Sequence, residues 1–187
     1  MIPDFIIIGS WMIYLTYFFT ATSKVKAIAE RQSLASTFHY RIFVGFAWFL
    51  LVFHRLPMPF NFSLTPQNDF TQIIGIAVCV GGLFVAIWAR RTLAGNWSSS
   101  VTFKANHELI RTGPYRFVRH PIYTGLLLMC LGSALDLGRL WAWIAPCSMF
   151  IGFWIKLKRE EKLLLQHFPN DYPIYRRQVK ALMPFII

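Results

Sequence analysis

The residues best suited to chemistry in this 187-residue chain lie between Gly113 and Gly125. This stretch places two arginines, a histidine and two tyrosines at the border between a polar loop and an apolar run that begins at Pro121. Proline is favoured in the first turn of a helix, where free backbone N–H groups favour anions. Arg119, His120 and Tyr123 flank this helix start, so we expect a binding site there. The two arginines alone could equally anchor a helix end at lipid headgroups.

The composition indicates a membrane protein that crosses the bilayer several times. The chain is 56% hydrophobic and only 14% charged, and it contains 18 phenylalanines. A net charge of +11 would otherwise suggest nucleic acid, but the basic residues lie between apolar runs. This arrangement favours the membrane surface and predicts no nucleic-acid partner. The three cysteines lack paired spacing and the five histidines include no i,i+4 pair, so neither a disulfide framework nor a metal site is predicted.

Five apolar runs predict an all-α, polytopic membrane helical bundle with about five transmembrane helices. The runs cover residues 5–22, 40–56, 70–88, 121–137 and 140–157. A cleaved signal peptide is the alternative for the first run, but no Lys or Arg precedes it. The last two runs are joined by so few residues that they must form an antiparallel hairpin. They are also near the lower length limit for spanning, which leaves a re-entrant hairpin as an alternative.

The polar segments between the runs carry further local signals. Residues 23–39 suggest a short interfacial helix or, equally, a solvated loop, and Asp69 is a plausible N-cap for the third run. Small residues four apart in that run, at 77 and 81 and at 82 and 86, predict close helix packing. Residues 92–119 form the longest polar segment, and such loops are often functional.

The chain after residue 157 becomes amphipathic, which suits a helix that leaves the bilayer and lies along its surface. A last short helix is expected from Tyr172 to near Pro184. We therefore divide the chain into residues 1–91, with three transmembrane helices, and a catalytic half, residues 92–187. The catalytic half contains the loop, the hairpin 121–157 and the amphipathic tail.

The basic residues predict the orientation of the bundle. All but two of the 19 Lys and Arg residues, Arg55 and Arg139, fall on one side of a five-helix topology. By the positive-inside rule that side is cytoplasmic, with the N-terminus outside and the C-terminus inside. His120 and Glu160 are then on the same, cytoplasmic, side of the membrane.

The ordered set of motifs in the second half of the chain resembles the isoprenylcysteine carboxyl methyltransferase family and its phospholipid methyltransferase relatives. The set consists of Gly-Pro-Tyr at 113–115, Arg-His-Pro-x-Tyr-x-Gly at 119–125, Glu-Glu at 160–161 and the spaced Phe, Tyr and Pro of the tail. His107 and Leu109 match the family's His-x-Leu. The resemblance covers roughly residues 96–184 and says nothing of the first three runs. It implies an integral membrane enzyme that uses S-adenosyl-L-methionine, held on the cytosolic side by the loop and tail helices.

Methyl transfer from a sulfonium is an in-line displacement, so the protein must mainly position two reactants in a suitable electrostatic environment. Together with the resemblance, this gives a predicted cofactor site of His107, Leu109, Gly113, Tyr115, His120, Pro121, Tyr123 and Glu160. The predicted catalytic residues are Arg119, Arg159 and Glu161. Adjacent helical residues point about 100° apart, so one glutamate should face the cofactor and the other a cation such as Arg116 or Arg159. A solvated, charged helix surface is the alternative for this pair.

The predicted acceptor is a lipophilic small molecule or lipidated substrate, whose apolar tail reaches the site sideways between helices. Bulky residues of the fifth run would border it, among them the predicted substrate-binding residues Phe153 and Trp154, and Arg159 would hold its polar headgroup. A second hypothesis is an NADPH-dependent membrane reductase of the steroid reductase type, which shares an Arg-His-Pro-x-Tyr segment. That pattern has an acidic residue soon after the glycine, whereas Gly125 precedes three leucines and a methionine. A non-enzymatic scaffold would leave the clustered His, Tyr and Glu without a purpose. Neither the acceptor atom nor the oligomeric state follows from the sequence.

Overall fold

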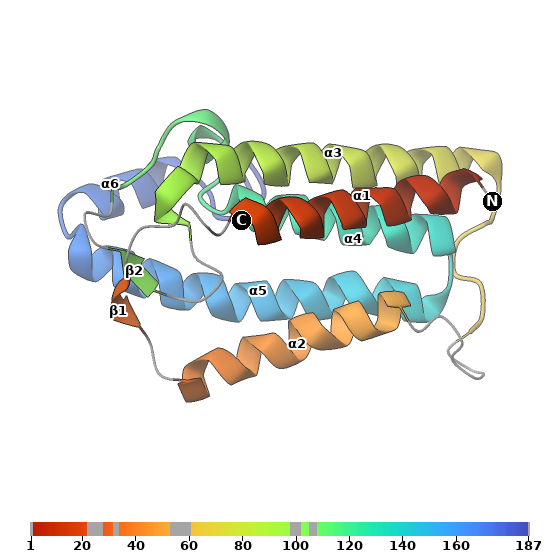
Figure 1. Cartoon of the computed structure of the whole chain (residues 1–187), viewed down its shortest axis with the longest axis horizontal. Coiled ribbons are helices and arrows are strands. Elements are labelled where there is room, and N and C mark those ends of the chain that lie inside the picture. The colour runs from red at the N-terminus through yellow and green to blue at the C-terminus, as the bar shows by residue number, and fades with distance from the viewer. Residues whose placement is uncertain are drawn as a thin grey trace.

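The computed structural model describes residues 2–21, 28–31, 34–52, 61–97, 102–104 and 108–186. Its described part contains five long helices that run side by side along one axis (Figure 1). These are α1 (Ile2–Thr20), α2 (Leu34–Val52), α3 (Asp69–Leu93), α4 (Pro121–Leu137) and α5 (Leu140–His167). A shorter helix, α6 (Asp171–Gln178), and two 3-10 turns, η2 (Ala94–Asn96) and η3 (Gly113–Arg116), complete the helical elements. The predicted helical bundle is thus confirmed.

A small antiparallel sheet is the part of the fold that the sequence did not predict. Strand β1 (Ile28–Arg31) pairs with β2 (Thr102–Lys104), and Arg31 lies opposite Thr102. Neither alternative for the first connector, an interfacial helix or a solvated loop, predicted the strand at β1. Pairing between strands satisfies backbone N–H and C=O groups of segments far apart in sequence, and a three- or four-residue strand has too little periodicity to be recognised. The sheet ties the segment after α1 to the segment after α3 at one end of the bundle (Figure 1).

Two helical stretches in the described residues are long and apolar enough to cross a membrane, namely Asp69–Asn96 and Leu140–His167. Three shorter apolar helices accompany them, Phe5–Thr20, Phe38–Val52 and Pro121–Leu137. Large apolar side chains point outward from the bundle, such as Phe5, Phe19 and Phe84 with exposed fractions of 72%, 81% and 67%. An outer surface of this kind suits contact with lipid rather than water. The number of spans, five, stays a prediction.

Glycines let α3 and α4 approach closely. A Cβ atom added to Gly82 would lie 2.5 Å from the carbonyl oxygen of Gly125, and Gly75 meets Gly132 in the same way one layer along. Ala86 is fully buried beside Gly125. The predicted packing pair at 82 and 86 is confirmed, whereas the pair at 77 and 81 is wrong, because both residues are exposed.

Helix α3 begins one residue earlier than the sequence suggested. Asn68, not Asp69, is the N-cap, and its side-chain oxygen accepts from the backbone N–H of Thr71 at 2.9 Å. The Thr71 hydroxyl accepts in turn from the backbone N–H of Asn68 at 3.3 Å, which completes a capping box. Asp69 occupies the first turn, where a negative charge interacts favourably with the helix dipole.

The chain after α6 binds the start of α4 through its backbone. Helix α6 ends at Gln178 rather than near Pro184, because the following residues pair with another segment. The backbone N–H groups of Arg119 and His120 donate to the carbonyl oxygens of Lys180 at 2.8 Å and Ala181 at 2.9 Å. The Thr124 hydroxyl donates to the carbonyl oxygen of Leu182 at 2.7 Å. The tail therefore fixes the loop that carries His120.

Candidate functional site

The helix start singled out in the sequence lies directly against the glutamate pair of α5. The Tyr123 hydroxyl donates to Oε1 of Glu160 at 2.7 Å. The imidazole of His120 lies between the two carboxylates, with Nδ1 3.6 Å from Oε2 of Glu160 and Nε2 3.4 Å from Oε1 of Glu161. The groups around His120 and Glu160, predicted to lie on one side of the membrane, thus lie at one end of the bundle, since α5 is one continuous helix that carries the glutamate pair beyond its apolar part. That this side is cytoplasmic stays a prediction.

The two glutamates have different surroundings. Glu161 is almost completely buried and accepts from Nη2 and Nε of Arg119 at 2.6 and 2.9 Å. Nε of Arg176 lies 3.5 Å from its other oxygen. Glu160 instead lines a cavity. The expected divergence of the pair is confirmed, but the expected cations are wrong. Arg119 and Arg176 take that place because the α6 segment folds back over α5.

Most of the hydrogen-bond donors of the Arg119 guanidinium bind neighbouring segments of the chain. Besides Glu161, its Nη1 donates to the backbone carbonyl oxygens of Arg176 at 3.3 Å and of Val179. Its side chain thus joins the start of α4, the end of α5 and the tail. Arg119 also borders the cavity. Its predicted contact with a bound cofactor stays a prediction.

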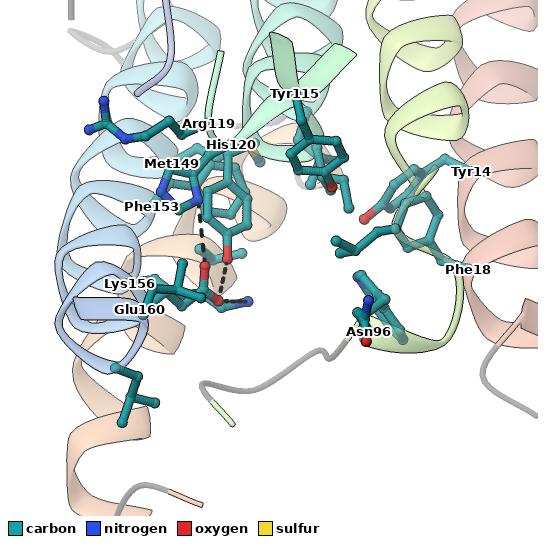
Figure 2. Close-up of a pocket in the computed structure, with 18 of the residues that line it drawn as sticks. Tyr14, Phe18, Asn96, Tyr115, Arg119, His120, Met149, Phe153, Lys156 and Glu160 are labelled. Atoms are coloured by element: carbon teal, nitrogen blue, oxygen red, sulfur yellow. Dashed lines mark hydrogen bonds and ion pairs between the residues drawn. The ribbon is translucent and has the colours of Figure 1, made fainter. Parts of the chain in front are cut away.

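The cavity has a volume of about 300 Å³, at the lower end of the range for ligand pockets. Figure 2 shows Glu160 and His120 on one side of it, with Asn96 and Phe18 across the open space. The polar and charged side chains that line it are Asn96, Tyr115, Arg119, His120, Tyr123, Lys156 and Glu160. Tyr14 and Trp97, which each carry one polar group on an aromatic ring, line it as well. Those whose contribution is apolar are Phe18, Val44, Trp48, Leu93, Ile122, Leu126, Met149, Phe153, Leu163 and Leu164. Arg119, His120, Tyr123, Lys156 and Glu160 form one wall, called the polar end below, Asn96 lies across the open space, and most of the remaining lining is apolar.

The predicted site residues divide into two groups. Those that line the cavity are Tyr115, Arg119, His120, Tyr123, Phe153 and Glu160. Those that are described but do not line it are Leu109, Gly113, Pro121, Trp154, Arg159 and Glu161. His107 lies outside the described residues.

Several residues of the second group have a structural place outside the cavity wall. Pro121 is buried at the first position of α4, and Gly113 has a φ of +57°, which favours glycine, where it packs against Thr92 and Trp88. Trp154 stacks on Phe150 with ring centroids 5.9 Å apart. Arg159 is half-buried and makes no ion pair with the described residues, and Nη1 of its guanidinium has no hydrogen-bond partner.

Two buried tyrosines connect η3 to α6 and α3. The Tyr175 hydroxyl donates to the backbone carbonyl oxygen of Tyr115 at 2.5 Å, and the Tyr115 hydroxyl reaches that of Ala89 at 3.4 Å. Burial raises the pKa of Tyr175 to about 12, although the charges of Arg119 and Arg111 act to lower it. Burial also raises the pKa of Tyr115 far above its ordinary value. Both phenols therefore remain protonated donors at physiological pH.

Sequence reasoning missed several cavity residues. Asn96 is 7% exposed, and its side-chain oxygen has no hydrogen-bond partner. Lys156 is 8% exposed, with Nζ 3.9 Å from Oε1 of Glu160. A lysine inside an apolar run is a recognisable signal, because ionisable residues in spans are usually functional. Asn96 carried no such signal, nor did Phe18 and Trp48, which are ordinary apolar residues until α1 and α2 are placed beside α5.

Comparison with known proteins shows which family the chain belongs to. Residues 70–171, which contain α3 from its second residue, α4, α5 and the first residue of α6, match the model of the phospholipid methyltransferase family. The chain belongs to this family. The predicted membrane methyltransferase is thereby confirmed, and neither the reductase nor the scaffold is favoured.

Relatives of the chain carry the name protein-S-isoprenylcysteine O-methyltransferase, in agreement with the predicted resemblance. The protein from Saccharomyces cerevisiae is 26% identical over 97% of this chain and 79% of its own length. That from Tribolium castaneum is 30% identical over 60% of this chain and 41% of its own. The solved structure of the eukaryotic intramembrane Ras methyltransferase ICMT superposes with a TM-score of 0.55 at 24% identity, covering 79% of this chain and 53% of that one. The chain thus shares that fold while spanning about half the length of the solved protein.

Proposed function

We propose that this methyltransferase transfers a methyl group from S-adenosylmethionine to a lipophilic acceptor of the isoprenylcysteine-carboxylate kind. The observation that carries the proposal is the cavity, which joins a polar end built on His120, Tyr123 and Glu160 to apolar walls. A methyl donor with charged and polar groups suits the polar end. An acceptor with a long apolar tail suits the apolar walls.

The residues at the polar end, together with Asn96 across the cavity, fit the groups of the cofactor. Its ammonium or ribose hydroxyls need acceptors, which the carboxylate of Glu160 and the unpartnered oxygen of Asn96 supply. Its carboxylate needs donors, which the imidazole of His120 and the guanidinium of Arg119 at the cavity wall would supply. The bound cofactor would supply an electrophilic methyl group on a sulfonium. The residues around it hold and orient the reactants and exclude water.

The acceptor would reach this site from the bilayer. The apolar walls come from four helices, with Phe18 on α1, Trp48 on α2, Leu126 on α4 and Phe153 on α5. Walls of this kind take up a prenyl or acyl chain by burial of apolar surface. We place the polar end on the cytoplasmic side and the N-terminus outside, because all but two of the 19 Lys and Arg residues fall on that side of the predicted five-helix topology.

Binding and turnover of the detergent-solubilised full chain test the proposal. S-adenosylhomocysteine and NADPH are titrated separately, and transfer of labelled methyl groups from S-adenosylmethionine to N-acetyl-S-farnesylcysteine is measured. We expect binding of S-adenosylhomocysteine, no binding of NADPH, and a labelled methyl ester. N-acetylcysteine without the farnesyl group is the matched control and should be a poor acceptor. Equal methylation of both compounds would contradict the lipophilic acceptor, and binding of NADPH alone would overturn the assignment.

A further inference from the structure

A lysine lies in the wall of the cavity, in a helix that is otherwise apolar up to that point. Lys156 precedes Glu160 by one helical turn, and Figure 2 shows its ammonium beside the Glu160 carboxylate at the polar end. Only 10% of its side chain is exposed. Burial of an ammonium group is costly unless nearby groups compensate the charge. We therefore expect groups that stabilise a positive charge beside the Lys156 ammonium.

Two aromatic rings and a carboxylate lie near the Lys156 ammonium, and the like charge of Arg41 also acts on it. Nζ lies 5.1 Å from the ring centroid of Tyr123 and 5.4 Å from that of Tyr40. Oε1 of Glu160 is 3.9 Å away. Tyr123 is held in place by stacking on Phe153, with ring centroids 4.6 Å apart. Aromatic faces with a carboxylate form the kind of cage that binds ammonium ligands. Here the ammonium of the chain itself occupies the cage.

The position of the Lys156 ammonium affects which acceptor charge the polar end of the cavity favours. Arg119 and Arg176 compensate the carboxylate of Glu161, which does not line the cavity. The carboxylate of Glu160 does line it, so without Lys156 this end would attract cations and repel a second carboxylate. The ammonium of Lys156 compensates the Glu160 carboxylate and so removes its repulsion of an acceptor carboxylate.

We propose that Lys156 is the specificity-determining residue that makes the site select carboxylate acceptors and reject amines. This inference rests on the proposed function and deepens it. Lys156 occupies the place that an acceptor ammonium would take and presents a positive charge to an acceptor carboxylate. Within a family that bears the name of phospholipid methyltransferases, the residue at this position would separate O-methylation from N-methylation in this chain.

The two reactions differ in their protons. A carboxylate oxygen forms a bond to the methyl carbon while the carbon–sulfur bond breaks and leaves its electron pair on sulfur. The products are a methyl ester and a thioether, no proton is released, and no general base is needed. An amine is protonated at neutral pH and must lose that proton before it can attack, and its methylated product is again an ammonium ion. A positive side chain assists the first reaction by holding the carboxylate and provides no base for the second.

The test uses two acceptors that differ only near the reacting atom. N-acetyl-S-farnesylcysteine offers a carboxylate, and S-farnesylcysteamine offers an amine on the same thioether. The full chain is compared with Lys156→Met, which removes the charge, Lys156→Arg, which keeps it, and Lys162→Met, an exposed control on the same helix. Measured quantities are kcat and KM for each acceptor and the affinity for S-adenosylhomocysteine, which reports folding.

We expect the unmodified chain to prefer the carboxylate. Lys156→Met should lower kcat/KM for the carboxylate about 10- to 100-fold, mainly through KM, the effect of losing one interaction between charged groups. Its kcat/KM for the amine should rise, while Lys156→Arg and Lys162→Met keep the carboxylate preference. The inference is overturned if Lys156→Met binds S-adenosylhomocysteine and keeps the full preference. It is also overturned if Lys156→Arg binds the cofactor product and loses the preference. Failure of the unmodified chain to methylate either acceptor would defeat the proposed function itself.

Discussion

Replacing each glutamate of α5 by glutamine should separate a structural carboxylate from a binding one. Glu161 accepts two hydrogen bonds from Arg119 at 2.6 and 2.9 Å, and 3% of its side chain is exposed. The Arg119 side chain is itself only 8% exposed, so Glu161→Gln leaves a buried guanidinium without its counter-charge. Breaking a buried ion pair by removing one partner costs about 3–5 kcal/mol. Glutamine keeps one acceptor oxygen, so we expect a loss of about 3 kcal/mol.

Glu160→Gln should affect binding instead. Its carboxylate is partly exposed to the cavity and is 23% exposed as a side chain, and the Tyr123 hydroxyl can still donate to a glutamine oxygen. We expect a smaller loss of stability than in Glu161→Gln, because Lys156 lies 3.9 Å from Glu160 and keeps the rings of Tyr40 and Tyr123 beside it. The affinity for S-adenosylhomocysteine should fall by about 1.5–3 kcal/mol, the usual value of a hydrogen bond to a charged group.

Thermal unfolding of the detergent-solubilised chain without ligand measures the first effect, and ligand titration measures the second. For a chain of this length, about 3 kcal/mol corresponds to a fall in Tm of about 6–12 °C. Glu108→Gln, at an exposed position, is the control and should change neither quantity. Equal losses of Tm in both variants of the pair, or the larger loss in Glu160→Gln, would refute the assignment of roles.

Three further predictions follow from the same geometry. His120→Ala should weaken S-adenosylhomocysteine binding about 10- to 100-fold in a titration, through loss of a donor to a charged group; unchanged affinity would return His120 to a packing role. Phe153→Ala should reduce discrimination between farnesyl and geranylgeranyl acceptors in competition assays, whereas Trp154→Ala, outside the cavity lining, should not; the opposite result would place the acceptor tail elsewhere. Single cysteines at Lys104 and Lys180, in a background without native cysteines, should react with an impermeant reagent from the same side of sealed vesicles; labelling from opposite sides contradicts the topology.

The sequence predicted the local features of the fold because they depend on local patterns. Apolar runs of sufficient length, together with the proline at position 121, predict where α4 and α5 lie. The same holds for the close packing at Gly82, since small residues four apart share one side of a helix. His120, Tyr123 and Glu160 were predicted as site residues from their types at the ends of apolar runs and from the family resemblance, and the structure places all three at the cavity.

The sequence by itself thus determined the helices and the residues capable of chemistry, whereas the tertiary structure decided which of them meet. The pairing of Glu161 with Arg119 and Arg176 depends on the tail, whose backbone binds the start of α4 across about 60 residues of sequence. The walls contributed by α1 and α2 and the enclosure of Lys156 between Tyr40 and Tyr123 depend on how distant helices are placed. No periodicity encodes such contacts, because periodicity describes the exposure of one element and not the identity of its neighbour.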